Sequence, residues 1–254
     1  MRSLFCILVL VWLAAAQDAQ QRNRDAILEF HIAAREKVQP SASNMMMMNY
    51  SMEMERLAYE WVRRCEFEHP DRNVHTQYKG IGQNLAIMTI GSPDWLRMAQ
   101  GWYNEIKDYD YASDRCRGVC GHYTQMIWAK TTEVGCAAQR CDSTMPSWNP
   151  PVYLLACQYK PSGNWNGQKP YESGRSCSGC PEGSVCHRNQ CVTGSLGINN
   201  KPTPTRQPMR PWEPQVTREP VRPREPLATR QPVRPRQPEP QRPRPKCLPR
   251  RKTG

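Results

Sequence analysis

The sequence predicts an α+β fold, a three-layer α-β-α sandwich built around a small antiparallel sheet. Residues 24–165 mix stretches of helical periodicity with short strand-like runs. These elements interleave too irregularly for a doubly wound parallel sheet, which favours the sandwich. At roughly 140 residues, the segment is large enough to form one domain with its own hydrophobic core. A four-cysteine module at residues 170–192 and a Pro/Arg-rich tail at residues 196–254 are expected to follow it.

Three amphipathic helices are expected, because apolar residues recur at the spacing of one helical face. The three faces consist of Ile27, Phe30, Ala34 and Val38; of Met54, Leu57, Ala58, Trp61 and Cys65; and of Trp95, Ala99, Trp102 and Ile106. The third helix is expected to begin at Ser92-Pro93-Asp94, with a capping residue followed by proline at the first helical position. His31 lies beside the apolar face of the first helix and is interpreted as a buried, hydrogen-bonded histidine.

Two strands are expected in the second half of the domain. The segments are "TTEVGCAAQRC" (131–141) and "PVYLLACQYKP" (151–161). Both are rich in β-branched and apolar residues and are bounded by glycine or proline, which is typical of buried strands.

The N-terminus predicts secretion. Residues 1–16 have one basic residue, Arg2, an apolar run from Leu4 to Leu13, and three alanines. This is the pattern of a signal peptide with an A-x-A cleavage site, so the mature chain is expected to begin at Gln17 and to be extracellular. The apolar run is too short to span a bilayer.

The cysteines divide into even groups once Cys6 is removed with the signal. In an oxidising compartment, the six at positions 65–157 and the four at positions 177–191 predict three and two disulfides, whose pairing the sequence leaves open. The ten residues are Cys65, Cys116, Cys120, Cys136, Cys141, Cys157, Cys177, Cys180, Cys186 and Cys191. For the last four, a zinc site is the competing but less favoured interpretation. Cys247 is the odd cysteine and predicts an interchain bridge, a mixed disulfide or a free thiol.

The tail carries nearly all of the net charge of +12. Residues 201–254 hold 15 Lys/Arg and 4 Asp/Glu, and residues 1–200 are almost neutral. A 12-residue repeat, "TRQPMRPWEPQV", "TREPVRPREPLA" and "TRQPVRPRQPEP", spans residues 205–240. Its proline content excludes helix and sheet and predicts a disordered, polyproline-like cationic spacer. We expect it to bind anionic surfaces or glycosaminoglycans, and we expect no nucleic-acid partner.

Three segments resemble the signature motifs of the CAP superfamily, which joins cysteine-rich secretory proteins, antigen 5 and pathogenesis-related proteins. They are "GQNLA" (82–86), "GHYTQMIW" (121–128) and "LLACQYKPSGN" (154–164). The likeness covers residues 24–192 and is greatest to the glioma-pathogenesis-related and peptidase-inhibitor-16-like branch. It implies the α-β-α sandwich described above. It also implies a cleft lined by two histidines and two acidic residues.

By motif, this cleft falls on His69, His122 and Glu105, with Gln83 where the family has its second acid. Two imidazoles and a carboxylate suit zinc or general acid/base chemistry. Gln83 argues against both, because an amide is no base and carries no negative charge. Three interpretations stay open: a hydrogen-bonded polar cluster, a metal site without catalysis, and a catalytic site, of which the first is favoured. No cofactor is required, and zinc is the one considered.

Two features outside the cleft also carry predictions. Asn49, in "NYS", is the only N-x-S/T sequon and a candidate glycosylation site. The preceding run of four methionines (45–48) is either an exposed apolar patch for a lipid or protein, or a loop folded onto the domain.

The function that these features favour is that of a secreted, non-enzymatic binding protein for a protein or lipid ligand in defence, venom or reproductive secretions. One alternative places antimicrobial or glycosaminoglycan-binding activity in the tail. Another is a metal-dependent protease that uses His69 and His122. Cys247 is a candidate for a disulfide bond to a partner chain.

Overall fold

The computed structural model describes residues 2–89, 91–142, 145 and 147–193. The predictions about the Pro/Arg-rich tail and Cys247 lie outside these residues. Within them, no helix has both the length and the apolar composition needed to cross a membrane.

A four-stranded sheet forms the middle layer, in the order β1 (Asn49–Tyr50), β5 (Glu133–Arg140), β6 (Tyr153–Lys160) and β2 (Gly82–Met88). The β5–β6 and β6–β2 pairs are antiparallel, and Cys136 lies opposite Cys157. The β1–β5 pair is parallel, so the sheet is mixed where an entirely antiparallel one was expected. The strand predictions for β5 and β6 are confirmed.

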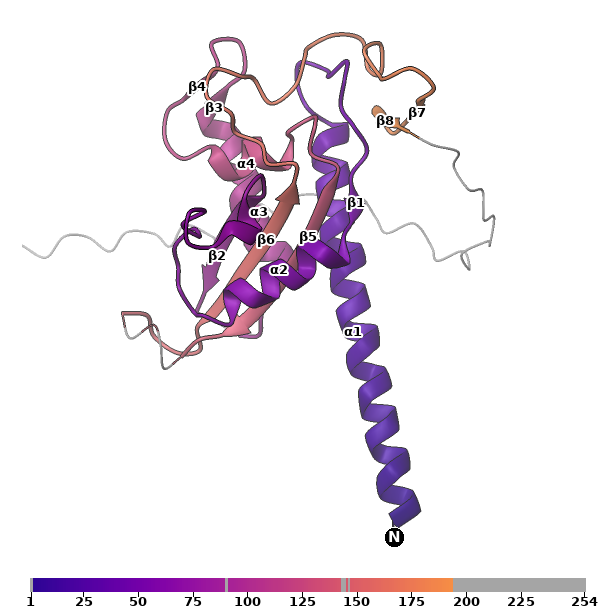
Figure 1. The fold of residues 1–254 in the computed structure, drawn as a ribbon, viewed down its shortest axis with the longest axis vertical. Coiled ribbons are helices and arrows are strands. Elements are labelled where there is room, and N and C mark those ends of the chain that lie inside the picture. Colours follow the sequence, from indigo (N-terminus) through magenta and orange to yellow (C-terminus); the bar gives the residue numbers. More distant parts are fainter. Residues whose placement is uncertain (1, 90, 143–144, 146, 194–254) are drawn as a thin grey trace, which may run out of the picture. The chain divides into compact units, whose positions relative to one another are not determined.

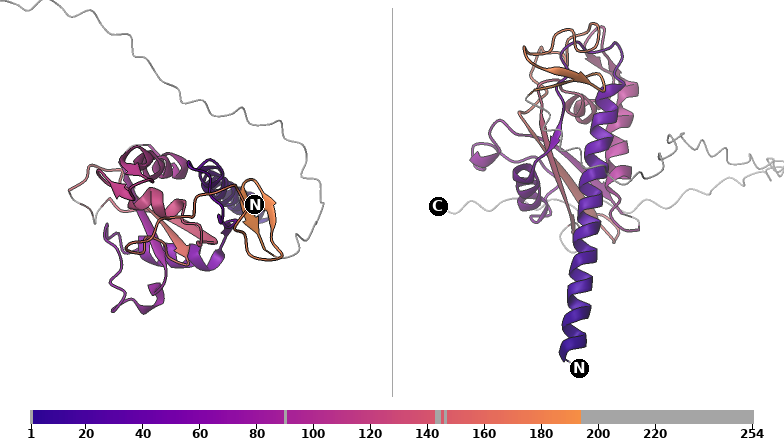
Figure 2. Two further views of the ribbon diagram at one scale, coloured as in Figure 1. Left: turned by 90° about the horizontal axis from the view of Figure 1, so that it is seen from above. Right: turned by 90° about the vertical axis from the view of Figure 1, so that its right-hand side faces the viewer.

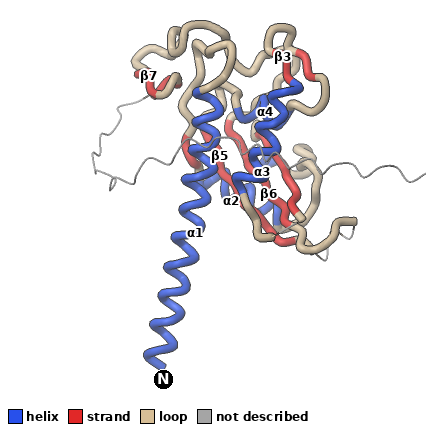
Figure 3. Tube along the Cα trace, turned by 180° about the vertical axis from the view of Figure 1, so that it is seen from behind, coloured by secondary structure: helices blue, strands red, loops and turns tan. Residues whose placement is uncertain are grey.

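Helices cover both faces of the sheet, which confirms the three-layer sandwich (Figure 1). On one face lies α2 (Met52–Val62). On the other lie α1 (Arg2–Glu36), α3 (Trp95–Tyr103) and α4 (Gly121–Met126), which Figure 3 shows from behind. Each face has its own apolar core, and strands β5 and β6 contribute side chains to both.

The helix boundaries differ from the prediction at four places. The third helix is capped by Asp94, whose side chain accepts a hydrogen bond from the Arg97 amide, and Ser92 plays no such role. Ile106 was expected to face inward, but it lies beyond α3 in a 3-10 helix, η2 (Asn104–Asp108), and is 39% exposed. Val38 and Cys65 likewise lie past the ends of α1 and α2. At the three C-terminal ends, the apolar spacing continues beyond the point where the helix stops.

Arg35 is the main polar link between α1 and the loops at the top of the domain. Its buried guanidinium donates hydrogen bonds of 2.7–3.2 Å to the carbonyls of Met46, Met126, Trp128, Ala129 and Thr131. Burial lowers its pKa to about 9. The guanidinium therefore stays charged at neutral pH and holds the ends of several loops in fixed positions.

The methionine run does not form an exposed patch. Met45 and Met48 are fully buried in the first core, so the loop is folded onto the domain. The same loop pairs with the four-cysteine module: the Met47 amide donates to the Cys191 carbonyl, and the Cys191 amide donates to the Met45 carbonyl.

The four-cysteine module contains two short strands, β7 (Val185–His187) and β8 (Gln190–Val192). It packs on the rest of the fold and does not form a separate unit. Arg188 forms ion pairs with Glu29 and Glu36 of α1, at 2.8 and 2.7 Å. Figure 2 shows this module beside the end of α1.

The ten cysteines form five disulfides. Residues 65–157 contain the pairs Cys65–Cys141, Cys116–Cys120 and Cys136–Cys157, and the module contains Cys177–Cys186 and Cys180–Cys191. The sulfurs of Cys177, Cys180 and Cys191 lie close enough to one another to suit a metal ion. All three are already bonded to another sulfur, so no thiolate is present to bind zinc.

Candidate functional site

His122 is held by Glu105 through both its side chain and its main chain. One Glu105 oxygen accepts from the His122 Nδ1–H at 2.5 Å. The other accepts from the backbone amides of His122 and Tyr123, at 3.0 and 3.2 Å. Glu105 comes from η2 and His122 from α4, so the carboxylate joins these two elements. Both Glu105 oxygens therefore accept hydrogen bonds, three in total, from a single short segment of α4.

The His122 ring also packs against Trp102 of α3, with the ring planes 20° apart and the centroids 6.1 Å apart. The Trp102 indole N–H donates to the Leu85 carbonyl at 2.9 Å. The ring therefore has a fixed orientation as well as a fixed tautomer, with the proton on Nδ1 and the lone pair on Nε2.

His69 forms a second pair, with Gln83. The His69 Nδ1 lies 2.8 Å from the Gln83 Oε1, and an amide oxygen only accepts, so Nδ1 carries the proton. The Gln83 Nε2 is buried and has no hydrogen-bond partner among the described residues. His69 itself lies on the exposed loop between α2 and η1 (Thr76–Tyr78).

Strand β2 explains how the two pairs are placed, because successive residues of a strand point to opposite faces of a sheet. Gln83 reaches His69, and the next residue, Asn84, donates to the His122 carbonyl at 3.1 Å. The two histidines are therefore fixed from opposite sides of the edge strand.

A buried chain of hydrogen bonds connects this edge to α1. The His31 Nδ1–H donates to the Ile27 carbonyl at 2.7 Å, so its Nε2 must accept from the Tyr159 hydroxyl at 2.9 Å. The Tyr159 oxygen in turn accepts from the Asn84 Nδ2 at 3.1 Å. Burial raises the pKa of Tyr159 well above its usual value, so the hydroxyl keeps its proton. The prediction of a buried, hydrogen-bonded His31 is confirmed, and Tyr159 and Asn84 are positioning residues that the motif comparison missed.

The four predicted cleft residues do not fit a catalytic zinc centre. Such a centre takes three protein ligands. Both Glu105 oxygens already accept hydrogen bonds from α4, and the Gln83 oxygen faces His69. Within the described part of the chain, no trio of His, Cys, Asp or Glu ligand atoms that contains either histidine has its members within 4.8 Å of one another. We therefore derive no chemical step through a metal.

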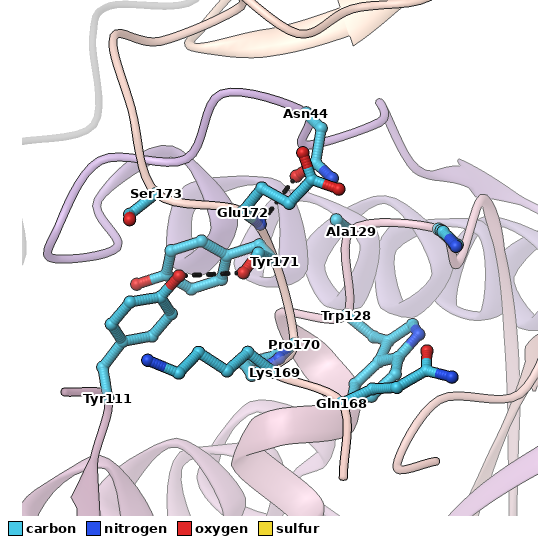
Figure 4. Close-up of a pocket in the computed structure, with 11 residues that line it drawn as sticks. Asn44, Tyr111, Trp128, Ala129, Gln168, Lys169, Pro170, Tyr171, Glu172 and Ser173 are labelled. Carbon is cyan, nitrogen blue, oxygen red and sulfur yellow. Dashed lines mark hydrogen bonds between the residues drawn. The ribbon is translucent and has the colours of Figure 1, made fainter. Parts of the chain in front are cut away.

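A cavity of about 500 Å³ lies elsewhere, where the end of α4 meets the segment that follows β6 (Figure 4). None of the four predicted cleft residues lines it. Its walls include Tyr111, Trp128, Lys130, Lys169 and Tyr171. This cavity could not be predicted from the sequence, because its residues come from four segments that are far apart in the chain.

The fold, the five disulfides and the three motifs define the class of protein. The chain belongs to the cysteine-rich secretory protein (CAP) family, whose model matches residues 24–159. The predicted resemblance is thereby confirmed, and so is the fold class.

Particular relatives agree with the suggested branch. The chain is 32% identical over 199 residues to glioma pathogenesis-related protein 1 of Mus musculus, which covers 72% of this chain and 74% of that protein. It is 37% identical over 189 residues to peptidase inhibitor 15 of Xenopus laevis, and the match covers 68% of this chain and 72% of that protein. Among solved structures, NaASP2 with Zn²⁺ matches with a TM-score of 0.53 at 26% identity, covering 66% of this chain and 94% of that one.

Proposed function

We propose that this protein is a secreted, non-enzymatic binding protein whose folded part engages a protein or lipid ligand. The observation that carries the proposal is that, among the described residues, no hydroxyl or thiol donates to the His122 Nε2, while Glu105 holds the Nδ1–H. Nucleophilic catalysis needs a hydroxyl or thiol within hydrogen-bond reach of its base. The His122 Nε2 keeps its lone pair but has no such nucleophile beside it, and the amide of Gln83 is no base.

Extracellular location is supported by the disulfides. Five bridges within residues 65–191 are typical of proteins that fold in an oxidising compartment. We propose that residues 1–16 direct the chain there, as the signal-peptide pattern indicates.

A hydrolysis assay tests the non-enzymatic part. The full chain and His122→Gln are incubated with a broad peptide library, in parallel with zinc and with a chelator. We expect no cleavage by the wild type above that of the variant in any condition. Cleavage by the wild type that the variant lacks would contradict the proposal.

A protein ligand is supported by two exposed aromatic side chains that touch each other. Phe67 and Trp148 are 47% and 42% exposed, and their ring centroids lie 6.4 Å apart. Exposed aromatic residues are enriched at protein interfaces. The name of the Xenopus relative makes peptidases one class of partner to test.

Native mass spectrometry of the protein secreted by eukaryotic cells separates the ligand classes. A bound lipid adds a discrete mass that organic solvent removes, whereas a protein partner appears as a complex in co-secretion experiments. Phe67→Ser/Trp148→Ser should lose a protein partner. The matched exposed control, Val74→Ser, should keep it.

The tail is a second candidate for function, because residues 201–254 concentrate 15 Lys/Arg against 4 Asp/Glu. We propose that it retains the protein at anionic surfaces or glycosaminoglycans through many weak, salt-sensitive contacts. Heparin binding should fall steeply with salt and should be lost in a chain that ends at residue 198. Retention by that shorter chain would place the binding in the folded part.

A further inference from the structure

The cavity beside α4 is lined by four chain segments that hydrogen bonds hold together. The Ala129 amide donates to the Pro170 carbonyl at 2.7 Å. The Tyr111 hydroxyl donates to the Tyr171 carbonyl at 2.9 Å. Because main-chain and side-chain bonds both cross the cavity walls, little ordering is needed when a ligand enters.

Aromatic side chains stand on two sides of the cavity, as Figure 4 shows. On one side, the rings of Tyr111 and Tyr171 stack with centroids 4.6 Å apart and planes 19° apart. On the other side lies Trp128, which is only 4% exposed. Its indole packs against the main chain of Gly163, where a Cβ would lie 2.6 Å from the ring. These fixed walls suit a compact ligand with a ring.

Several hydrogen-bond donors around this cavity have no partner among the described residues. The indole N–H of Trp128 has no hydrogen-bond partner among the described residues, although the side chain is almost completely buried. Lys130 is exposed at the rim and forms no ion pair within the described part of the chain. Lys169 lies 4.5 Å above the ring of Tyr111 and uses one donor on the Ala112 carbonyl, which leaves two.

We propose that this cavity binds a small organic anion, a carboxylate or sulfate carried on a compact ring. The acidic group accepts from the Trp128 indole N–H and from the Lys130 ammonium. The ring lies against Pro170 and Tyr171. A volume of about 500 Å³ is large for an inorganic anion and is in the range of small-molecule sites.

Glu172 sets a limit on the ligand's charge. Its exposed side chain also lines the cavity, and Figure 4 shows its carboxylate on the side away from Lys169. A second negative charge on the ligand would face this carboxylate and be repelled. The site therefore favours a monoanion, which distinguishes it from the polyanions that the tail is expected to attract.

Two classes of ligand combine an acidic group with a compact ring, namely acidic sugars and aromatic acids. Four probes distinguish them. The probes are glucuronate and 4-hydroxybenzoate, with glucose and 4-hydroxybenzamide as their neutral counterparts. The full chain is labelled with ¹⁵N-tryptophan, and the indole signal of Trp128 is assigned by its loss in Trp128→Phe. Anions that bind only to the tail leave this signal unmoved, so the readout is specific to the cavity.

At least one acid should shift the Trp128 signal saturably, and its neutral counterpart should not. Lys130→Gln should weaken that binding roughly tenfold, because one charge-assisted hydrogen bond is lost. Lys79→Gln, which removes an exposed lysine outside the cavity, should leave it unchanged. A response to glucuronate identifies an acidic sugar, and a response to 4-hydroxybenzoate identifies an aromatic acid.

Three results would overturn the inference. They are no shift with either acid, equal shifts with acids and neutral compounds, and equal affinity of Lys130→Gln and wild type. Lys130 is exposed, so Lys130→Gln retains the fold, and Trp128→Phe serves only to assign the signal. The cavity shares no residue with the two histidine pairs, and the test is therefore independent of the proposed function.

Discussion

The carboxylate of Glu105 binds His122 by its ring and by its main chain at once, at 2.5 and 3.0 Å. This arrangement gives Glu105 a structural role. Both oxygens of this acid accept hydrogen bonds from α4, and they thereby fasten α4 to η2. The pair is thus an anchor for the short helix α4, which also carries the loop that ends in the cavity.

Glu105→Gln should destabilise the fold by about 2–3 kcal/mol, because it places an amide N–H against a donor and weakens charge-assisted hydrogen bonds. Urea unfolding measures the loss. Glu60→Gln is the matched control, since Glu60 pairs only with Arg56 on the exposed face of α2. The control should lose no more than about 0.5 kcal/mol. Equal losses in the two variants would show that Glu105 is no anchor.

Stability should fall as the pH drops from 7 to 5 because of His31. Burial lowers the pKa of His31 to about 4, and the neighbouring Arg35 acts in the same direction. The unfolded chain therefore binds a proton from about pH 6.5 downward, whereas the folded chain does not, which favours unfolding. The expected contribution is about 2 kcal/mol between pH 7 and pH 5.

The variant His31→Gln isolates this contribution. It should be less stable than wild type at pH 7, and the difference should shrink as the pH falls. A difference that stays constant across this range would mean that folding leaves the pKa of His31 unchanged, which would contradict the prediction.

Arg35→Lys should cost about 3 kcal/mol or more, although it conserves the charge. An ammonium has three donors at one point and cannot reach the five carbonyls that the guanidinium fork spans, so buried carbonyls lose their partners. Thermal unfolding and secreted yield measure the effect. Arg22→Lys, at an exposed position of α1, should behave as wild type.

Asn49 should carry a glycan when the chain is made in eukaryotic cells. It is exposed in β1. Ser51, two residues later, caps α2 by accepting from the Met54 amide at 3.4 Å. Asn49→Gln and Ser51→Ala should both abolish the mass shift that an N-glycosidase produces. Only Ser51→Ala should also lower stability, by about 1 kcal/mol. Ser51→Thr should keep both the glycan and the cap, and a wild-type chain without any shift would refute the site.

Much of the fold could be predicted because its strongest elements follow simple periodicities. The apolar face of α2 and the continuous apolar runs of β5 and β6 can be recognised in the sequence without knowing which elements they pack against. Strand β2 was missed because "GQNLAIM" is an edge strand that starts with glycine and two amides. Its pairing depends on β6, and only the sheet register brings Gln83 opposite Gln158.

The candidate site was predicted by residue type, but its arrangement was not. The motifs named His69, His122, Glu105 and Gln83, and the structure pairs His69 with Gln83 and His122 with Glu105. Their partners depend on which face of β2 each side chain meets, and that is a tertiary property. The cavity was beyond prediction for the same reason, since Trp128 and Tyr171 become neighbours only when the segment after β6 folds back onto the end of α4.

Zinc titration by calorimetry tests the central claim most directly, namely that the two histidines belong to separate hydrogen-bonded pairs and not to one metal centre. The full chain is compared with His69→Ala/His122→Ala under identical conditions. We predict the same heats for both proteins, because the pairs offer two imidazole nitrogens and no third ligand. A saturable zinc-binding heat in the wild type that disappears in the double variant would contradict the account.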